Sequence, residues 1–432
     1  MGAPAKWRNE LYPLGFVGLM FSNTLYNQWV RYYYAPPPGK TSPGMGTIPG
    51  GAEAIAALLL LSFLLQAALN PVIGQWADRT RTRWGRRRPF VLLGALPLAA
   101  LFLGLFLGLL PGLVAVPVFG ALFVVVIQPY MSLLPSVARD ERMRMRLSLT
   151  GGVLALLAVG AAFVSGPKLL DAFGFPGLAW AGAGAIFALL ALPGLVMQEA
   201  PPPAEVPPWS GPGAFAAVVR ESGILRFLVG NGLLTGALVA LTIASPYVAE
   251  ALLGQPRAYT AELNRSLFAG MILSVPVLGL LVPRIGASRA MQGGAALGAL
   301  VLLGLWFLSG DPAARVPGPL WSVGFGLFGL TTLAAISLPP LVIARYADAD
   351  GRGREGLFFG SNGLAINVGQ AVAAGVASLL LSRGAEGVRE VMLADAAALA
   401  LAIALIRSDG PPLAAAGGAA SARPQSEAPP SG

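Results

Sequence analysis

The densest charge in the chain lies in residues 78–88, DRTRTRWGRRR, where one aspartate is accompanied by six arginines and no lysine. A carboxylate at a helix end can pair with guanidinium groups and with the positive N-terminus of a neighbouring helix, and so hold one side of a helix bundle shut. A cluster that only meets lipid head groups needs charge alone, and lysine would serve as well. The arginines, with Asp78 and Gly85, therefore favour a gate.

Uncharged polar side chains inside apolar stretches form a second set that could bind a ligand. Asn23, Asn27 and Arg31 share one helical face, with Tyr26 beside them. Hydrogen bonds between helices are the alternative role for such groups. Gathered around one cavity, neutral donors and acceptors suit a polyhydroxylated solute such as a sugar. The predicted solute-binding residues are Asn23, Tyr26, Asn27, Arg31, Gln66, Asn70, Gln128, Tyr130, Asn231, Thr235, Asn362, Asn367 and Gln370.

The residues needed for most enzyme chemistry are missing. The chain has no Cys and no His, which excludes thiolate chemistry, a histidine proton relay and imidazole metal sites. No nucleophile–base set, metal cluster or phosphate-binding loop stands out. We therefore expect no enzyme activity, no metal and no cofactor.

The composition predicts a membrane protein, because 55% of the 432 residues are hydrophobic and only 11% are charged. A helix that crosses a bilayer needs about 20 mostly apolar residues. Windows free of Asp, Glu, Lys and Arg run over 11–30, 54–77, 90–138, 147–167, 172–198, 227–249, 266–283, 290–310, 316–344 and 356–382. A final apolar segment, 391–406, is interrupted only by Asp395. The 90–138 window is long enough for two crossings. We predict an all-α membrane protein with twelve transmembrane helices.

The distribution of positive charge predicts the orientation. With the N-terminus in the cytoplasm, the cytoplasmic loops and tails hold 21 of the 29 Lys and Arg. The net charge of +9 is thus a topology signal, and we expect no nucleic-acid partner. We predict an integral protein of the plasma (inner) membrane with both termini cytoplasmic, surrounded by lipid and monomeric.

Two landmarks predict an internal repeat. Gly74, followed by Asp78, recurs 205 residues later as Gly279, and Pro135 recurs at the same offset as Pro340. The implied organisation is a six-helix half at 1–198, a Pro-rich cytoplasmic linker at 199–213, a second six-helix half at 214–407 and a disordered cytoplasmic tail at 408–432.

The arginine-rich loop resembles that of the major facilitator superfamily, and its full form, DRTRTRWGRRRPF, is similar to the glycoside–pentoside–hexuronide cation symporters and the related sucrose transporters. The stretches 129–146 and 351–370 also look like loops of these transporters. The resemblance implies a major facilitator fold with alternating access. It also implies a cytoplasmic gate, for which we select Gly74, Asp78, Arg79, Arg83, Gly85, Arg86, Arg142 and Arg345.

The sequence departs from the cation symporters where they carry acidic residues on the second helix. The matching positions are Gln66 and Asn70, and an amide offers only a carbonyl oxygen to a cation. The fourth-helix carboxylate falls near Ile127, and the eleventh-helix lysine near Asn367. Asp395 is an acid inside a span, but a twelfth helix usually lies outside the pathway.

These observations predict a secondary transporter for a small polar solute, a sugar or glycoside, driven by a proton rather than sodium. Three alternatives stay open. The first is an uncoupled sugar facilitator. The second is a lipid or amphiphile transporter, in which Arg31 would meet a head group. The third is a receptor or assembly factor on the same scaffold that transports nothing.

Overall fold

The computed structural model describes residues 6–40, 45–138, 140–199, 211–310, 318–350 and 355–406. Nearly all of the described residues are helical. Most of the predicted linker, and the predicted tail at 408–432, lie outside the described residues.

The first part of the chain forms helices that alternate in direction. The elements are the 3-10 helix η1 (Lys6–Leu11), α1 (Tyr12–Tyr34), α2 (Gly51–Arg79), α3 (Arg88–Phe106), α4 (Gly112–Ser132), α5 (Leu134–Val137), α6 (Glu141–Ile186), the π-helix η2 (Phe187–Ala191) and α7 (Leu192–Val196). The long α6 is two helices, because Gly174 breaks it with φ 64° and ψ −166°. Only glycine adopts such angles without strain.

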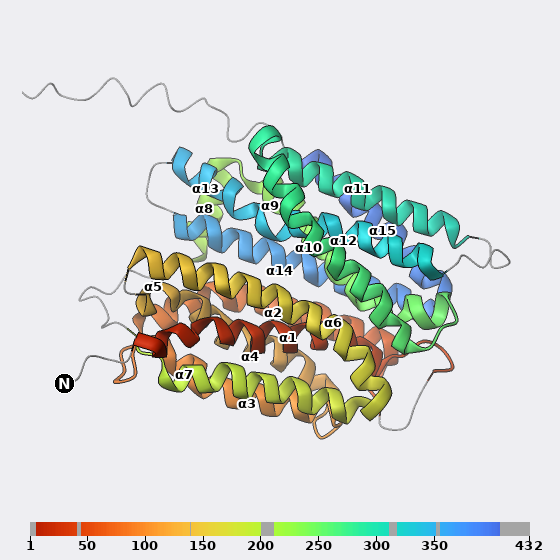
Figure 1. The fold of residues 1–432 in the computed structure, drawn as a ribbon, viewed down its shortest axis with the longest axis horizontal. Helices are drawn as coiled ribbons and strands as arrows, with labels where there is room; N and C mark the ends of the chain where they lie inside the picture. Colours follow the sequence, from red (N-terminus) through yellow and green to blue (C-terminus); the bar gives the residue numbers. More distant parts are fainter. Residues whose placement is uncertain are drawn as a thin grey trace, which may run out of the picture.

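The second part repeats this plan. Its elements are α8 (Pro212–Ser222), α9 (Leu225–Tyr247), the π-helix η3 (Val248–Leu252), the 3-10 helix η4 (Arg257–Tyr259), α10 (Thr260–Ile285), α11 (Ala287–Leu308), α12 (Gly318–Ser337), α13 (Pro339–Asp350), α14 (Glu355–Leu380), the 3-10 helix η5 (Leu381–Arg383) and α15 (Ala385–Leu405). In Figure 1 the red-to-yellow helices of the first part lie below the green-to-blue helices of the second.

The outer surface of the bundle is apolar, as a bilayer requires. Leu93, Trp180 and Phe307 are among the large hydrophobic side chains left exposed. Nine helices of the described chain are long and apolar enough to cross a membrane. One of them, Arg142–Val196, contains the break at Gly174, and α1 and α15 are not among the nine. The all-helical membrane fold is thus confirmed, while the count of twelve spans stays a prediction.

Each part contains a similar contact, in which a side chain binds carbonyls at the end of its last helix. Arg88 at the start of α3 donates hydrogen bonds to the carbonyls of Gly194 (3.1 Å) and Leu195 (2.9 Å) near the end of α7. Gln292 of α11 donates to the carbonyls of Ile403 (3.1 Å) and Ile406 (2.5 Å) at the end of α15. Gln292 follows Arg88 by 204 residues, one fewer than the 205 that separate the sequence landmarks. The contact is made by a guanidinium in one part and by a neutral amide in the other, and the repeat stays a prediction.

Contacts between the two parts run along α2 and α14, α6 and α10, and α1 and α9. The basic end of the bundle carries the loop of residues 80–87 between α2 and α3, and the opposite end carries residues 35–40 and 45–50 between α1 and α2.

Candidate functional site

Asp78 and Arg87 form the centre of a polar network at the basic end. Asp78 closes α2, and its Oδ1 accepts hydrogen bonds from Arg87 Nε (3.1 Å) and Nη2 (2.5 Å). The Arg87 side chain is 11% exposed and that of Asp78 35%. Arg87 Nη1 also donates to the Ser132 carbonyl at the end of α4 and to Ser136 Oγ in α5 (3.4 Å). One guanidinium thus joins three segments, which the single ammonium of a lysine would not reproduce.

Arg88 makes the same kind of contact with a second helix. Its Nε and Nη2 donate to the Gly194 carbonyl, and Nη2 also donates to that of Leu195. Carbonyls in the last turn of a helix lack partners within the helix, and cationic side chains satisfy them well. Arg87 and Arg88 therefore bind the ends of α4 and α7, so their geometry matters as well as their charge.

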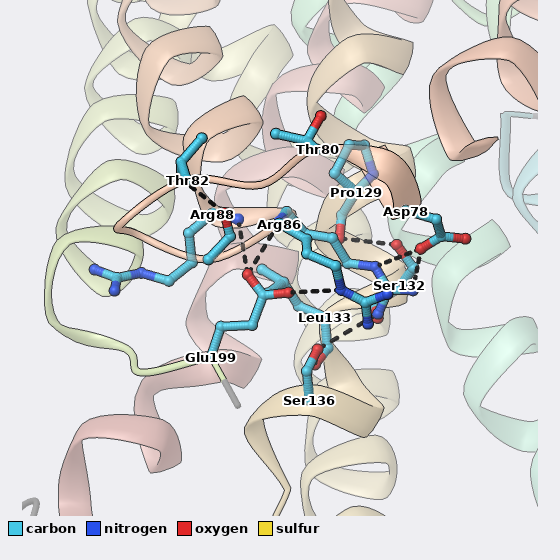
Figure 2. Close-up of polar contacts among 12 residues, drawn as sticks. Asp78, Thr80, Thr82, Arg86, Arg88, Pro129, Ser132, Leu133, Ser136 and Glu199 are labelled. Atoms are coloured by element: carbon cyan, nitrogen blue, oxygen red, sulfur yellow. Dashed lines mark hydrogen bonds and ion pairs between the residues drawn. The ribbon is translucent and has the colours of Figure 1, made fainter. Parts of the chain in front are cut away.

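Glu199, which follows α7 in the chain, also belongs to this network. Its Oε2 accepts hydrogen bonds from the backbone N–H groups of Arg87 (3.0 Å) and Arg88 (3.3 Å), and its Oε1 lies 3.9 Å from Arg86 Nε. The Glu199 side chain is fully buried. A carboxylate at a helix N-terminus satisfies free N–H groups and complements the helix dipole, so Glu199 caps α3. Figure 2 shows this carboxylate directed at the loop between Arg86 and Arg88.

Gly85 shapes the loop around that carboxylate. Its φ is +108°, and a Cβ added there would collide with the Glu199 carboxylate. Thr82 closes the turn, because its Oγ1 donates to the Gly85 carbonyl (2.7 Å) and accepts from Trp84 N–H (3.2 Å). The positive φ of Gly85 and the close approach of the Glu199 carboxylate therefore both explain why this residue is a glycine.

Three further residues predicted for the gate, Arg83, Arg142 and Arg345, form no hydrogen bond or ion pair with this network among the described residues. Arg83 is exposed, with its guanidinium 5.1 Å from the centre of the Trp84 ring. Arg142 and Arg345 are exposed as well, and among the described residues neither is in an ion pair with Asp78 or Glu199. Arg79 is half-buried at the end of α2. We therefore replace Arg83, Arg142 and Arg345 in the candidate network with Arg87, Arg88 and Glu199.

All of the segments joined by this network belong to the first half: α2, α3, α4, α5 and α7. Asn9 of η1 adds a further link, because its Nδ2 donates to the carbonyls of Val137 (2.8 Å) and Gln198 (3.1 Å), and its Oδ1 accepts from Gln198 N–H (2.8 Å). The expected gate between neighbouring helices is therefore, in this conformation, a clamp that joins segments of the first half to one another. We call it the basic-end clamp.

The two halves are joined instead at the opposite end, where Arg31 is central. Its Nε (3.2 Å) and Nη2 (2.7 Å) donate to the Ser378 carbonyl of α14, and Nη1 donates to the Ala35 carbonyl (2.9 Å). The guanidinium lies 4.5 Å from the centre of the Tyr247 ring, and Arg31 is 1% exposed. Arg31 is thus committed to contacts within the protein. We revise its predicted role from solute or head-group contact to closure of this end.

Neighbouring side chains extend this closure. Tyr32 donates to Glu250 Oε2 (2.5 Å), Tyr247 donates to the Ala35 carbonyl, and Gln28 donates to Ser245 Oγ (3.2 Å). Each of these hydrogen bonds connects α1, or the residue that follows it, with α9 or η3 in the second half. Sequence analysis missed this set. The aromatic run at 32–34 was its signal, but such runs are also common at membrane interfaces.

Two of the predicted aromatic solute contacts are packed inside the first half. Tyr130 is fully buried, donates to the Tyr12 carbonyl and stacks on the Tyr12 ring at 5.0 Å. Tyr26 is 2% exposed, donates to the Val116 carbonyl (3.1 Å) and stacks on Phe119 at 4.1 Å. We therefore revise both from ligand contacts to helix packing.

Several amides link helices. Asn231 Nδ2 of α9 donates to Asn362 Oδ1 of α14 (2.9 Å), and Gln128 Nε2 of α4 donates to Asn70 Oδ1 of α2 (2.5 Å). Thr235 donates to carbonyls of its own helix, as does Asn367. For Asn231, Thr235 and Asn362, which are buried, helix packing therefore replaces the predicted solute contact.

The half-buried residues keep a solute-binding role as a prediction. They lie on α1, α2, α4 and α14, and comprise Asn23, Asn27, Gln66, Asn70, Gln128, Asn367 and Gln370. Gln66 lies against Gly120 of α4, beside Ser62. None of these residues is charged, so the set offers amide donors and acceptors.

Comparison with known proteins identifies the family. The sequence matches the family described as MFS/sugar transport protein over residues 11–406. The chain belongs to this family. The resemblance to the major facilitator superfamily is thereby confirmed, and this member of the MFS/sugar transport family is an integral membrane transporter of small solutes.

Curated relatives of this MFS/sugar transport protein include the glucuronide carrier protein homolog of Escherichia coli (strain K12). It is 23% identical over 406 residues, which cover 88% of this chain and 84% of the relative. The putative glycoside/cation symporter YagG of the same organism is 40% identical over 68 residues, 16% of this chain and 13% of the relative. The solved nucleoside transporter NupG has a similar fold, with a TM-score of 0.65, 16% identity and coverage of 93% of this chain and 98% of NupG.

Gly74 gives a prediction about the motion of this transporter. It lies inside α2, and a Cβ added there would meet nothing within 4 Å. A helical glycine costs about 1 kcal/mol relative to alanine, and this conformation gives no local reason for it. We expect Gly74→Leu to fold normally but to lower uptake at least tenfold, because it would obstruct closure of the basic end.

The measurements for Gly74→Leu are melting temperature and solute uptake. Gly304→Leu is the matched control, since Gly304 of α11 also has open space around it and is exposed. Equal uptake by the two variants would show that no helix approaches Gly74 during transport.

Proposed function

We propose that this protein is a secondary transporter for a neutral sugar or glycoside, which it moves by alternating access between its two six-helix halves. The basic end faces the cytoplasm of a cell whose plasma (inner) membrane holds the protein as a monomer, with both termini on that side. In the present conformation the opposite, external end is closed by Arg31 and its neighbours. The open space around Gly74 supports a basic end that is not closed.

The observation that carries this proposal is the set of half-buried amides on α1, α2 and α4, a set that contains no carboxylate. Neutral donors and acceptors match the hydroxyl groups of a sugar. The family relationship and the glycoside/cation symporter among the relatives support the same solute class. A glucuronide would need a cation in the site, and Arg31, the only cation among the predicted contacts, is occupied in the closure.

We propose a proton as the driving ion, as the family resemblance implies. Facilitated diffusion is a second candidate, and one observation favours it. Asn70 stands where relatives carry an acid, and its carbonyl oxygen already accepts a hydrogen bond from Gln128. Sodium fits least, because a sodium site requires several free oxygen ligands.

Uptake into proteoliposomes tests the proposal. We expect saturable uptake of at least one labelled neutral disaccharide or glycoside, with the corresponding glucuronide taken up at least tenfold more slowly. Stimulation by an inward proton gradient would indicate symport, and uptake that ignores the gradient would indicate facilitated diffusion. An absence of saturable flux across a broad panel of saccharides would refute the sugar assignment.

A further inference from the structure

A deep groove lies in the second half between α14 and α15, with α9 as its floor. α9 packs closely against both helices, whereas α14 and α15 have few contacts with each other. The groove has a cavity volume of about 730 Å³, and Phe215 and Ala216 of α8 line it near the basic end. This volume falls in the range of small-molecule sites. None of the predicted solute-binding residues lines the groove.

The groove opens on the outer, apolar surface of the bundle. Leu225 and Val229 of α9 and Val372 and Val376 of α14 line it and remain between 43% and 55% exposed. Along α14 the lining extends from Ser361 to Leu380, a rise of about 28 Å, close to the thickness of the hydrocarbon core. A ligand would therefore enter from the bilayer and not through the solute pathway.

Of the described residues that line this groove, Asp395 is the one with a charged side chain. It lies midway along α15, is 6% exposed, and among the described residues its Oδ2 has no hydrogen-bond partner. An unpaired carboxyl group is costly in apolar surroundings, and ionisable groups at this depth usually serve a ligand or an ion. Ser361 is the other side chain with a hydrogen-bonding group in the described part of the lining, and it lies near the basic end of α14.

Among the described residues no Lys or Arg lines the groove, so we look to its occupant for the partner of Asp395. A lipid acyl chain would fill the space but would bring no donor to the middle of the bilayer. A protonated amine brings both a positive charge and N–H donors, and these give the strongest hydrogen bonds to a carboxylate.

We propose that this groove binds a lipophilic amine. The ammonium group donates to Asp395 Oδ2, and the apolar body lies between α14 and α15 over α9. The site goes beyond the proposed sugar transport and uses none of its residues.

Binding of radiolabelled dodecylamine to the full chain in phosphatidylcholine nanodiscs tests this site, with dodecanol as the probe that lacks the charge. We expect saturable dodecylamine binding to the native chain, at least tenfold weaker binding to Asp395→Asn, and no saturable binding of dodecanol to either. Glu386→Gln is the matched control on α15, since Glu386 is 64% exposed and pairs with Arg389; it should bind dodecylamine like the native chain.

A second variant separates loss of the site from loss of the fold. Val376→Trp fills the groove from its exposed side and leaves Asp395 intact, so it should abolish dodecylamine binding with a native melting temperature. Equal dodecylamine binding by the native chain and Asp395→Asn would overturn the proposal, and so would equal binding of amine and alcohol, which would mark the groove as a lipid-chain site. If Asp395→Asn fails to fold, native-like dodecylamine binding by Val376→Trp would also overturn the proposal.

Discussion

Glu199→Ala should lower solute uptake at least tenfold and lower the melting temperature of the protein. The fully buried carboxylate caps α3 by accepting from two backbone N–H groups, and it faces Arg86. Its removal would leave these donors without a partner, at a cost of about 2–4 kcal/mol, and would remove one of the links between the loop and the segment that follows α7. The first half would then no longer move as one rigid body.

Glu199→Gln distinguishes the role of the charge from that of the hydrogen bonds. It keeps a carbonyl acceptor but loses the negative charge. We therefore expect a solute uptake and a melting temperature between those of the native chain and those of Glu199→Ala. Glu10→Ala is the matched control, because Glu10 is an acid at the same end in an exposed ion pair with Arg146, and such pairs contribute about 0–1 kcal/mol. The clamp would be ruled out if Glu199→Ala lowered solute uptake and melting temperature no more than Glu10→Ala does.

Arg31→Met should shift the protein toward a conformation that is open at the opposite end. The native guanidinium crosses between the halves through the Ser378 carbonyl and the Tyr247 ring. Hydrogen bonds to a buried charged group contribute about 1.5–3 kcal/mol, so we expect the ratio of closed to open molecules to fall by a factor of roughly 30. Uptake should fall as well, because the cycle needs this end to close.

Cysteine labelling measures this shift, since the chain has no native cysteine. A single reporter, Asn27→Cys, is treated from the opposite side with a membrane-impermeant maleimide, with and without Arg31→Met. We expect labelling to be faster with Arg31→Met and intermediate with Arg31→Lys. Arg383→Met is the control, because Arg383 is exposed and pairs with Glu390 at the same end. Unchanged labelling by Arg31→Met would exclude the closure role.

Local patterns predicted much of the fold and of the arginine-rich loop. Apolar windows of bilayer length predicted the helices, because every backbone group in a membrane must be bonded within the protein. Asp78 and Gly85 were also predicted as special positions. Asp78 pairs with an arginine of its own loop, and Gly85 has the positive φ that its turn requires.

Residues whose role depends on distant partners could not be predicted in this way. Glu199 reads as the first residue of a Pro-rich linker, and it caps α3 only because the end of α7 lies beside residues more than 100 positions earlier. Arg31 continues a polar stripe, and sequence alone does not show whether such a stripe meets a solute or another helix. Tyr130 and Asn231 were likewise predicted to contact a solute, but each donates a hydrogen bond to another helix.

The sequence by itself determined that this chain is a helical membrane transporter, since hydropathy, charge asymmetry and the form of one loop depend on residues close together in the chain. Only the tertiary structure decided which polar residues hold the protein together and which remain half-buried. It also brought Asp395 of α15 to the wall of an apolar groove. The physical reason is that a polar side chain in a membrane must find a partner, and that partner is chosen by how the helices pack.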